Sequence, residues 1–169
     1  KLTYLGLESK SGFSNLIDNK WWEFDISSPS RRSITNDIQA AIGIEQLKKI
    51  DVQIENRKLI HDTYTKELKE LSWLNVPLDL RMGVSSSYYM YHIQTTNKKD
   101  RDKLAKYLRN KGIYTTFRYY PLHLVKYFKT NISLPNTEKA AYSTLCIPLH
   151  QGLKKDEVLY IIETIKTFK

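Results

Sequence analysis

The sequence is poor in the residues that build covalent, metal-based or glycine-rich sites. It has one cysteine, Cys146, in 169 residues, which excludes an internal disulfide framework and a zinc site made of several cysteines. Its six glycines never fall in the GxGxxG or GxxxxGK[S/T] spacing of phosphate-binding loops. The GxSxG turn that presents a nucleophilic serine is also absent. Nucleotide-binding folds built on such loops and serine hydrolases built on that turn are therefore excluded.

Long apolar runs are missing as well. Runs such as residues 40–44 and 158–162 fall far short of the roughly 18 residues that a membrane-spanning helix needs. Residues 1–20 contain no apolar stretch of the kind found in secretory signals. With 41% apolar and 27% charged residues, we expect a soluble, reduced, cytoplasmic globular protein. Because the chain starts at Lys1 without an initiator methionine, we also expect it to be a fragment or a cut domain.

Positive charge is in excess, with 27 Lys and Arg against 18 Asp and Glu and a net charge of +9. Such a charge suits nucleic acid or a smaller phosphorylated ligand. The densest cluster consists of Lys98, Lys99, Arg101, Lys103, Lys106, Arg109 and Lys111. These residues surround a predicted helix and do not line one side of it, which favours a solvated helix over a nucleic-acid platform. Consecutive tyrosines at positions 88 and 89 would point to opposite faces of a strand, so they cannot form one stacking surface.

The chain changes character at residue 36. The first 35 residues have no sustained periodicity, and only residues 21–26 resemble a strand. Apolar residues then recur at three- to four-residue steps over residues 36–71, which predicts one long amphipathic helix with Thr35 or Asn36 as its cap. A helix of this length usually links two layers or two domains.

After this helix, strand and helix patterns alternate. The sequence predicts strands at residues 86–95, 113–120 and 145–149, and helices at residues 100–111, 136–144 and 155–168. Gly112 stands where a helix commonly ends. This order predicts an α/β or α+β fold, with a small sheet covered by helices.

Few residues are candidates for chemistry. The four histidines are scattered in the sequence and predict no metal site, and Cys146 lies in an apolar strand as a buried thiol. Arg31 and Arg32 precede the long helix, where guanidinium groups and free helical amides could hold a phosphate; a charged turn explains them equally well. Arg118 lies among bulky rings at the exit of a predicted strand, where it either faces an anionic partner or is solvated.

Four stretches in the expected order resemble one known family. They are NDIQAAIGIEQLKKID at residues 36–51, IYTTFRYYPLHL at 113–124, CIPLHQGLKKDEV at 146–158 and the segment at 20–29. Together they resemble the C-terminal part of the DegT/DnrJ/EryC1/StrS sugar aminotransferases. The resemblance implies a fold-type-I enzyme that uses pyridoxal 5'-phosphate. It also implies a homodimer that transfers an amino group, typically from glutamate, to a keto sugar on a nucleoside diphosphate.

The resemblance assigns few residues in this chain. Arg32 falls where the family has a residue that reaches the cofactor phosphate of the neighbouring subunit, although Ile34 replaces a nearby basic residue. Arg118 falls where the family has a substrate-side His or Arg, and Tyr89 replaces a common His. The Schiff-base lysine of the family belongs to the large domain upstream, so no catalytic residue is assigned here.

We therefore predict three parts. Residues 1–35 would be the remnant of the large cofactor-binding domain, residues 36–71 the linking helix and residues 72–169 the C-terminal small domain. Two alternatives remain open at this point. One is a stand-alone basic module that binds nucleic acid through Arg31, Arg32 and the helix at 98–111. The other is a degenerate, non-catalytic family member.

Overall fold

The computed structural model describes residues 35–116, 120–125 and 131–168. The chain divides into two compact units, residues 1–49 and residues 50–169, which are described separately. The strand expected at residues 21–26 lies outside the described residues.

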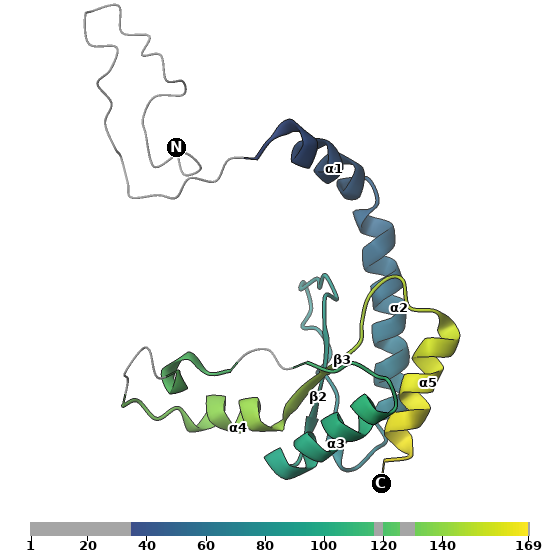
Figure 1. The fold of residues 1–169 in the computed structure, drawn as a ribbon. Helices are drawn as coiled ribbons and strands as arrows, with labels where there is room; N and C mark the ends of the chain where they lie inside the picture. Colours follow the sequence, from purple (N-terminus) through teal and green to yellow (C-terminus); the bar gives the residue numbers. More distant parts are fainter. Residues whose placement is uncertain (1–34, 117–119, 126–130, 169) are drawn as a thin grey trace, which may run out of the picture. The chain divides into compact units, whose positions relative to one another are not determined.

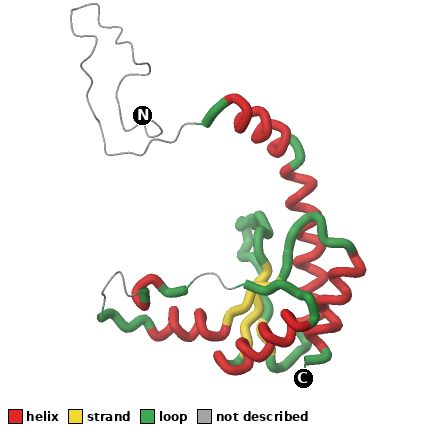
Figure 2. The backbone as a smooth tube through the Cα atoms, in the orientation of Figure 1, coloured by secondary structure: helices red, strands yellow, loops and turns green. Residues whose placement is uncertain are grey.

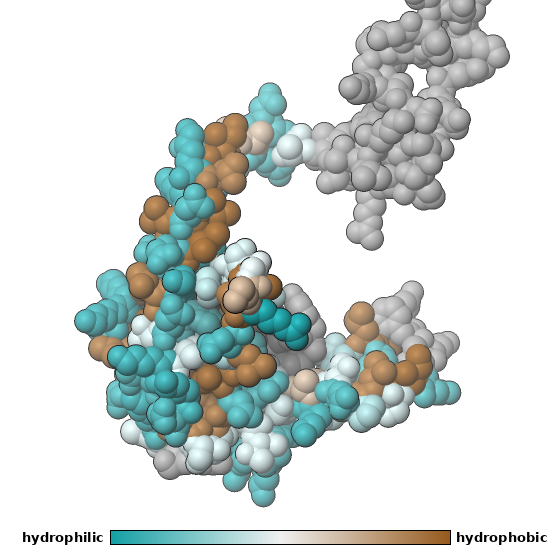
Figure 3. Space-filling model, turned by 180° about the vertical axis from the view of Figure 1, so that it is seen from behind, coloured by the Kyte–Doolittle hydropathy of each residue, from teal (hydrophilic) through white to brown (hydrophobic). Residues whose placement is uncertain are grey.

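In the first unit, the structure describes one helix, α1 (Asp37–Leu47). Its cap is Asn36, one of the two predicted candidates: the Asn36 side chain accepts a hydrogen bond of 2.9 Å from the backbone N–H of Gln39. None of the residues of α1 is buried, although Ile38, Ile42 and Leu47 are apolar. Apolar side chains of the helical segments are visible at the surface in Figure 3.

The expectation of one continuous helix over residues 36–71 is wrong. The structure has two helices, α1 and α2 (Ile50–Leu68), separated by a turn at residues 48–49. There the N–H of Lys49 bonds to the carbonyl of Gln46, three residues back, at 3.0 Å, so the chain tightens out of α-geometry. Lysine is a good helix former, and neither Pro nor Gly marks the break, so apolar periodicity alone could not show it.

The second unit is built on a three-stranded antiparallel sheet (Figures 1 and 2). Its strands are β1 (Leu74–Asn75), β2 (Tyr91–Thr95) and β3 (Thr144–Ile147), in the order β1-β2-β3. His92 lies opposite Cys146 and Ile93 opposite Leu145. β2 is therefore the central strand, and its two faces differ sharply.

One face of the sheet forms the core. Tyr91, Ile93 and Thr95 of β2 are buried, whereas the intervening His92 and Gln94 are only partly covered. In its described residues, the second unit has the α-helices α2, α3 (Lys98–Asn110), α4 (Pro135–Ser143) and α5 (Lys155–Lys166) and the short 3-10 helix η1 (Leu122–Leu124). α2 and α5 pack side by side, and α3 contacts β2, β3 and α5 (Figure 1). The buried cluster comprises Tyr64, Leu68, Leu74, Tyr91, Ile93, Leu104, Leu108, Ile113, Leu145, Ile147, Val158, Ile161, Ile162 and Ile165.

Helix α3 ends where it does because of the backbone conformation at Gly112. Its φ of +76° is a left-handed conformation that favours glycine. The N–H of Gly112 bonds to the carbonyl of Arg109 at 3.0 Å, and that of Ile113 bonds to Leu108 at 2.9 Å. This is the Schellman ending, with Ile113 and Leu108 both in the core. It directs residues 113–116 back along the sheet.

The predicted α+β fold class is confirmed, with a small sheet covered by helices. The helices at 100–111, 136–144 and 155–168 are present with shifted ends. The strand expected at 113–120 is corrected: in its described part, only Thr116 pairs, in an isolated bridge to Cys146. The strand expected at 86–95 begins only at Tyr91. The boundaries predicted between the large-domain remnant, the linking segment and the small domain stay predictions.

Within the part of the chain that the structure describes, none of the helices has both the length and the apolar composition required of a membrane span.

The core predicts a large penalty for truncating α3. Leu108→Ala should lower the free energy of unfolding by roughly 2–5 kcal/mol, because Leu108 is fully buried and its removal leaves a cavity. Urea denaturation followed by circular dichroism measures this change. Leu159→Ala on α5 is the control, since Leu159 is 45% exposed, and it should change the free energy by less than about 1 kcal/mol. Equal losses in both variants would contradict the assigned core.

Candidate functional site

Arg32 and Arg118, the two residues selected from the sequence, both lie outside the described residues. The same holds for Arg31. The structure does describe the residues that precede Arg118 in the sequence, as far as Thr116. Thr116, two positions earlier, exchanges both backbone hydrogen bonds with Cys146 of β3, at 2.7 and 3.0 Å. The candidate site is therefore built from described residues around this bridge.

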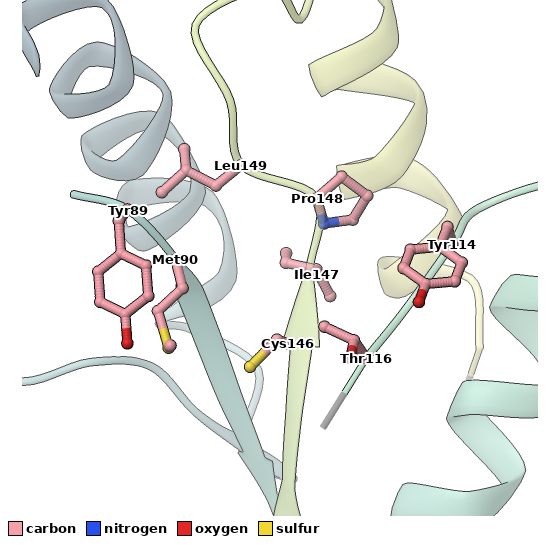
Figure 4. Close-up of a pocket in the computed structure, with 8 residues that line it drawn as sticks. All are labelled: Tyr89, Met90, Tyr114, Thr116, Cys146, Ile147, Pro148 and Leu149. Atoms are coloured by element: carbon pink, nitrogen blue, oxygen red, sulfur yellow. The ribbon is translucent and has the colours of Figure 1, made fainter. Parts of the chain in front are cut away.

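A hollow of about 220 Å³ lies beside the bridge, at the end of the sheet where β2 begins and β3 ends. We call it the first hollow. Its lining residues are Tyr89, Met90, Tyr114, Thr116, Cys146, Ile147, Pro148 and Leu149. Figure 4 shows β3 between the two segments that complete it: Tyr89 and Met90 lie on one side, and Tyr114 and Thr116 lie on the other.

The first hollow offers rings and hydroxyl groups. Tyr89 is 61% exposed and Tyr114 is 75% exposed, so both rings are accessible. The thiol of Cys146 belongs to a residue that is only 4% exposed, which confirms the interpretation of Cys146 as buried. Among the described residues that line the hollow there is no carboxylate, amine or imidazole. This composition suits binding of a ligand and not proton transfer near neutral pH.

A second hollow lies between α2 and residues 76–92, and it also includes Tyr89 and Met90. The ring of His61 on α2 contacts two tyrosine rings edge-on, those of Tyr88 and Tyr91, each with centroids 5.0 Å away. Tyr88 has a φ of 46°, a strained left-handed conformation for a residue with a side chain, and its N–H is held by the hydroxyl of Ser86 at 3.0 Å. His61, Tyr88 and Tyr91 therefore form a fixed aromatic group.

No pattern in the sequence indicates that His61 and His92 share the second hollow, because they are far apart in the chain. Burial lowers the pKa of His92, and the nearby His61 lowers it further. His123 lies elsewhere, with its Nε2 3.0 Å from the Glu138 carboxylate, and this hydrogen bond holds the pKa of Glu138 below its usual range. Within the described residues, no three potential metal ligands gather in one place.

Tyr64 and Tyr91 are held by partly buried hydrogen bonds. The hydroxyl of Tyr64 donates to the carbonyl of Pro148 at 2.9 Å, and that of Tyr91 lies 3.0 Å from the hydroxyl of Thr65. Burial raises the pKa of Tyr91 to about 12 and also raises the pKa of Tyr64. The Tyr64 bond ties α2 to the residue that follows β3, so one contact supports both hollows.

The model of the DegT/DnrJ/EryC1/StrS aminotransferase family matches residues 10–166. The chain belongs to this family. The resemblance of the four sequence stretches is thereby confirmed.

Two curated relatives illustrate the match to the DegT/DnrJ/EryC1/StrS family. The dTDP-4-dehydro-2,3,6-trideoxy-D-glucose 4-aminotransferase of Saccharopolyspora spinosa is 37% identical over 94% of this chain and 41% of its own length. GDP-perosamine synthase of Escherichia coli O157:H7 is 29% identical over 90% of this chain and 40% of its own length. The chain thus spans about 41% of the length of such relatives.

Solved structures agree on the fold. The aminotransferase TlmJ from Streptoalloteichus hindustanus superposes with a TM-score of 0.81 at 38% identity, over 99% of this chain and 42% of TlmJ. The putative sugar aminotransferase Spr1654 from Streptococcus pneumoniae, in its PMP form, gives a TM-score of 0.76 at 28% identity, over 99% of this chain and 41% of Spr1654. A PLP form of Spr1654 matches as well. This part of the family fold is therefore present here.

The described residues do not supply the amine that pyridoxal phosphate needs. A lysine that holds this cofactor must lie beside its ring, with an acidic partner for the ring nitrogen. None of the described lysines is buried. The two that are partly covered, Lys58 and Lys166, lie close to Asp62 and Glu67, at 4.0 and 2.7 Å. We therefore derive no catalytic step from this part of the chain.

The buried tyrosines predict a loss of stability in alkali. A raised pKa means that folding favours the neutral phenol, so this contribution is complete below pH 10 and is lost as the pH rises through about 12. Tyr91→Phe should reduce the loss between pH 10 and 12 by on the order of 2 kcal/mol. Urea denaturation across this range provides the measurement. Tyr114→Phe, at an exposed position, should keep the full loss. An unchanged loss in Tyr91→Phe would contradict this assignment.

Proposed function

We propose that this chain is the C-terminal part of a pyridoxal-phosphate-dependent aminotransferase that acts on a keto sugar carried by a nucleoside diphosphate. The match to the family model over residues 10–166 carries this proposal. Relatives named as aminotransferases of dTDP- and UDP-linked sugars support the substrate class. The amino donor is proposed to be glutamate, as the family resemblance implies.

In the complete enzyme, this part binds and positions the substrate and does not carry the reactive lysine. The first hollow presents the exposed rings of Tyr89 and Tyr114 and the hydroxyl of Thr116, which suit the faces and hydroxyl groups of a sugar. The cofactor would supply the chemistry of amino transfer when it is bound to the large domain.

Arg32 and Arg118 keep the roles that the resemblance implies. Arg32 is proposed to reach the cofactor phosphate of a neighbouring subunit, which makes the enzyme a homodimer. Arg118 is proposed to contact the substrate; Thr116, two positions earlier in the sequence, lines the first hollow. A cytoplasmic location also stays a prediction from the sequence.

The first experiment tests the division of labour. The 169-residue chain, incubated with pyridoxal phosphate and then borohydride, should show no stoichiometric pyridoxyl adduct on any one lysine, because its described lysines are not buried. Peptide mass mapping identifies the adducts. A protein extended upstream to the length of its relatives should give one stoichiometric adduct on a lysine in the added part. A stoichiometric adduct on the 169-residue chain would overturn the proposal.

The second experiment tests Arg118 in the extended protein. Arg118→Ala should raise the KM for the nucleotide-linked keto sugar by about tenfold, since it removes a charge-assisted contact, and should leave the KM for glutamate unchanged. Steady-state assays that vary each substrate separately provide the measurement. Arg81→Ala, at an exposed described arginine outside the first hollow, is the control. An extended protein that binds the cofactor but transfers no amino group would indicate a non-catalytic family member.

A further inference from the structure

A groove beside α3 collects positive charge on one side of the helix. It has a volume of about 710 Å³ and runs between α3 and residues 114–116. We call it the α3 groove. It is lined by Arg101, Asp102, Ala105, Lys106, Arg109, Asn110, Tyr114, Thr115, Thr116 and Leu145. Three residues of the basic cluster seen in the sequence line this groove, namely Arg101, Lys106 and Arg109, and the other four do not.

The spacing on α3 explains the shape of the groove. Arg101, Ala105 and Arg109 follow one another at four-residue steps, so they lie along one face of the helix. The small side chain of Ala105 leaves open space between the two arginines, and Lys106 lies beside it. A hollow between three cations is a suitable place for an anion.

Charge in the α3 groove is poorly compensated. Asp102 is the only carboxylate among its described lining residues, and its Oδ1 lies 2.7 Å from Nε of Arg101. Lys106 and Arg109 form no ion pair with any described residue. Lys98 of α3 does not line the groove and lies over the ring of Tyr142 at 5.0 Å. Lys106 and Arg109 therefore remain available to a ligand.

The opposite wall supplies neutral donors. Tyr114, Thr115 and Thr116 carry hydroxyl groups, and the backbone of Thr116 is fixed by its bridge to Cys146. Arginine and lysine on one wall and hydroxyl-bearing residues on the other can surround a tetrahedral oxyanion with both charged and neutral hydrogen bonds. This combination is typical of phosphate recognition.

The α3 groove adjoins the first hollow. Tyr114 and Thr116 line both, so the two spaces border the same short segment of chain. A ligand with an uncharged part in the first hollow could therefore extend a charged part into the groove. In a nucleotide sugar, the sugar is joined directly to the diphosphate, which matches this order.

We propose that the α3 groove binds the diphosphate of the nucleotide-sugar substrate through Lys106 and Arg109, with hydroxyls of residues 114–116 opposite. The choice of a nucleoside diphosphate rests on the proposed function. The presence of an oxyanion site rests on the groove alone.

Binding of inorganic pyrophosphate to the 169-residue chain tests the site. Isothermal titration calorimetry should show saturable binding, and Lys106→Gln and Arg109→Gln should each weaken it about tenfold because each removes a charge-assisted hydrogen bond. Lys103→Gln is the matched control, since Lys103 is an exposed lysine of the same helix that does not line the groove. It should change the affinity less than about twofold.

Two outcomes would overturn the site itself. Equal weakening by all three substitutions would show diffuse attraction to a basic helix. In NMR spectra, pyrophosphate should shift the backbone amide signals of Thr115 and Thr116, and shifts confined to another part of the chain would place the anion elsewhere. Thermal unfolding by circular dichroism verifies that each variant remains folded.

Further ligands identify the source of the phosphate. UDP should bind at least as tightly as pyrophosphate, and methyl phosphate should bind more weakly, because a diphosphate reaches both cations. Methyl phosphate binding as tightly as UDP would overturn the diphosphate assignment in favour of a phosphate monoester. A single-stranded oligonucleotide that binds more tightly than UDP at equal salt, with loss in the same two variants, would favour nucleic acid instead.

The extended protein separates failure of the groove from failure of the proposed function. If it transfers amino groups and Arg109→Gln leaves the KM for the nucleotide sugar unchanged, the groove assignment is wrong and the proposed function stands. If the chain binds UDP through Lys106 and Arg109 but the extended protein has no aminotransferase activity, the proposed function is wrong and the oxyanion site stands.

Discussion

Burial of one face of β2 is the constraint on which the rest of the second unit depends. Tyr91 and Ile93 are fully buried under α2, α3 and α5, and their alternation with His92 and Gln94 follows directly from the pleat of a strand. On the other face of β2, His92 and Gln94 are partly covered, and Cys146, which lies opposite His92, is buried. The first hollow lies at the end of this sheet, so the requirement for a core also determines where a ligand has access.

Hydrogen bonds between distant segments hold the open side in place. The hydroxyl of Tyr64 donates to the carbonyl of Pro148, and Thr116 and Cys146 exchange two backbone hydrogen bonds. Each bond ties β3 or its exit to a segment that is remote in the sequence. A rigid element that carries the lining residues of a hollow preorganises it, and less free energy is then lost in ordering side chains when a ligand binds.

Periodicity predicted the helices at 98–110 and 155–166 well, because a buried apolar face with three- to four-residue spacing leaves a clear pattern. Periodicity failed where hydrogen bonding between strands decides the structure. The β-branched and aromatic residues after Gly112 favour a strand, but only Thr116 among the described ones finds a partner. Arg118 stands out at the exit of a predicted strand, but only the resemblance assigns it a substrate-side role. The first hollow joins residues near 89, 115 and 147, and no local pattern predicts that antiparallel pairing brings them together.

The charge on α3 shows how a sequence pattern can be read correctly and still miss a site. Seven basic residues within residues 98–111 do surround the helix, as the sequence indicates. Packing then divides them, because Leu104 and Leu108 bury one side of α3 and the Schellman ending at Gly112 returns the chain along the adjacent side. Of the basic residues, Arg101, Lys106 and Arg109 line the α3 groove together with the hydroxyl-bearing residues 114–116. The selection among equivalent lysines and arginines is therefore made by the turn that follows the helix, and its physical cause is the left-handed conformation at one glycine.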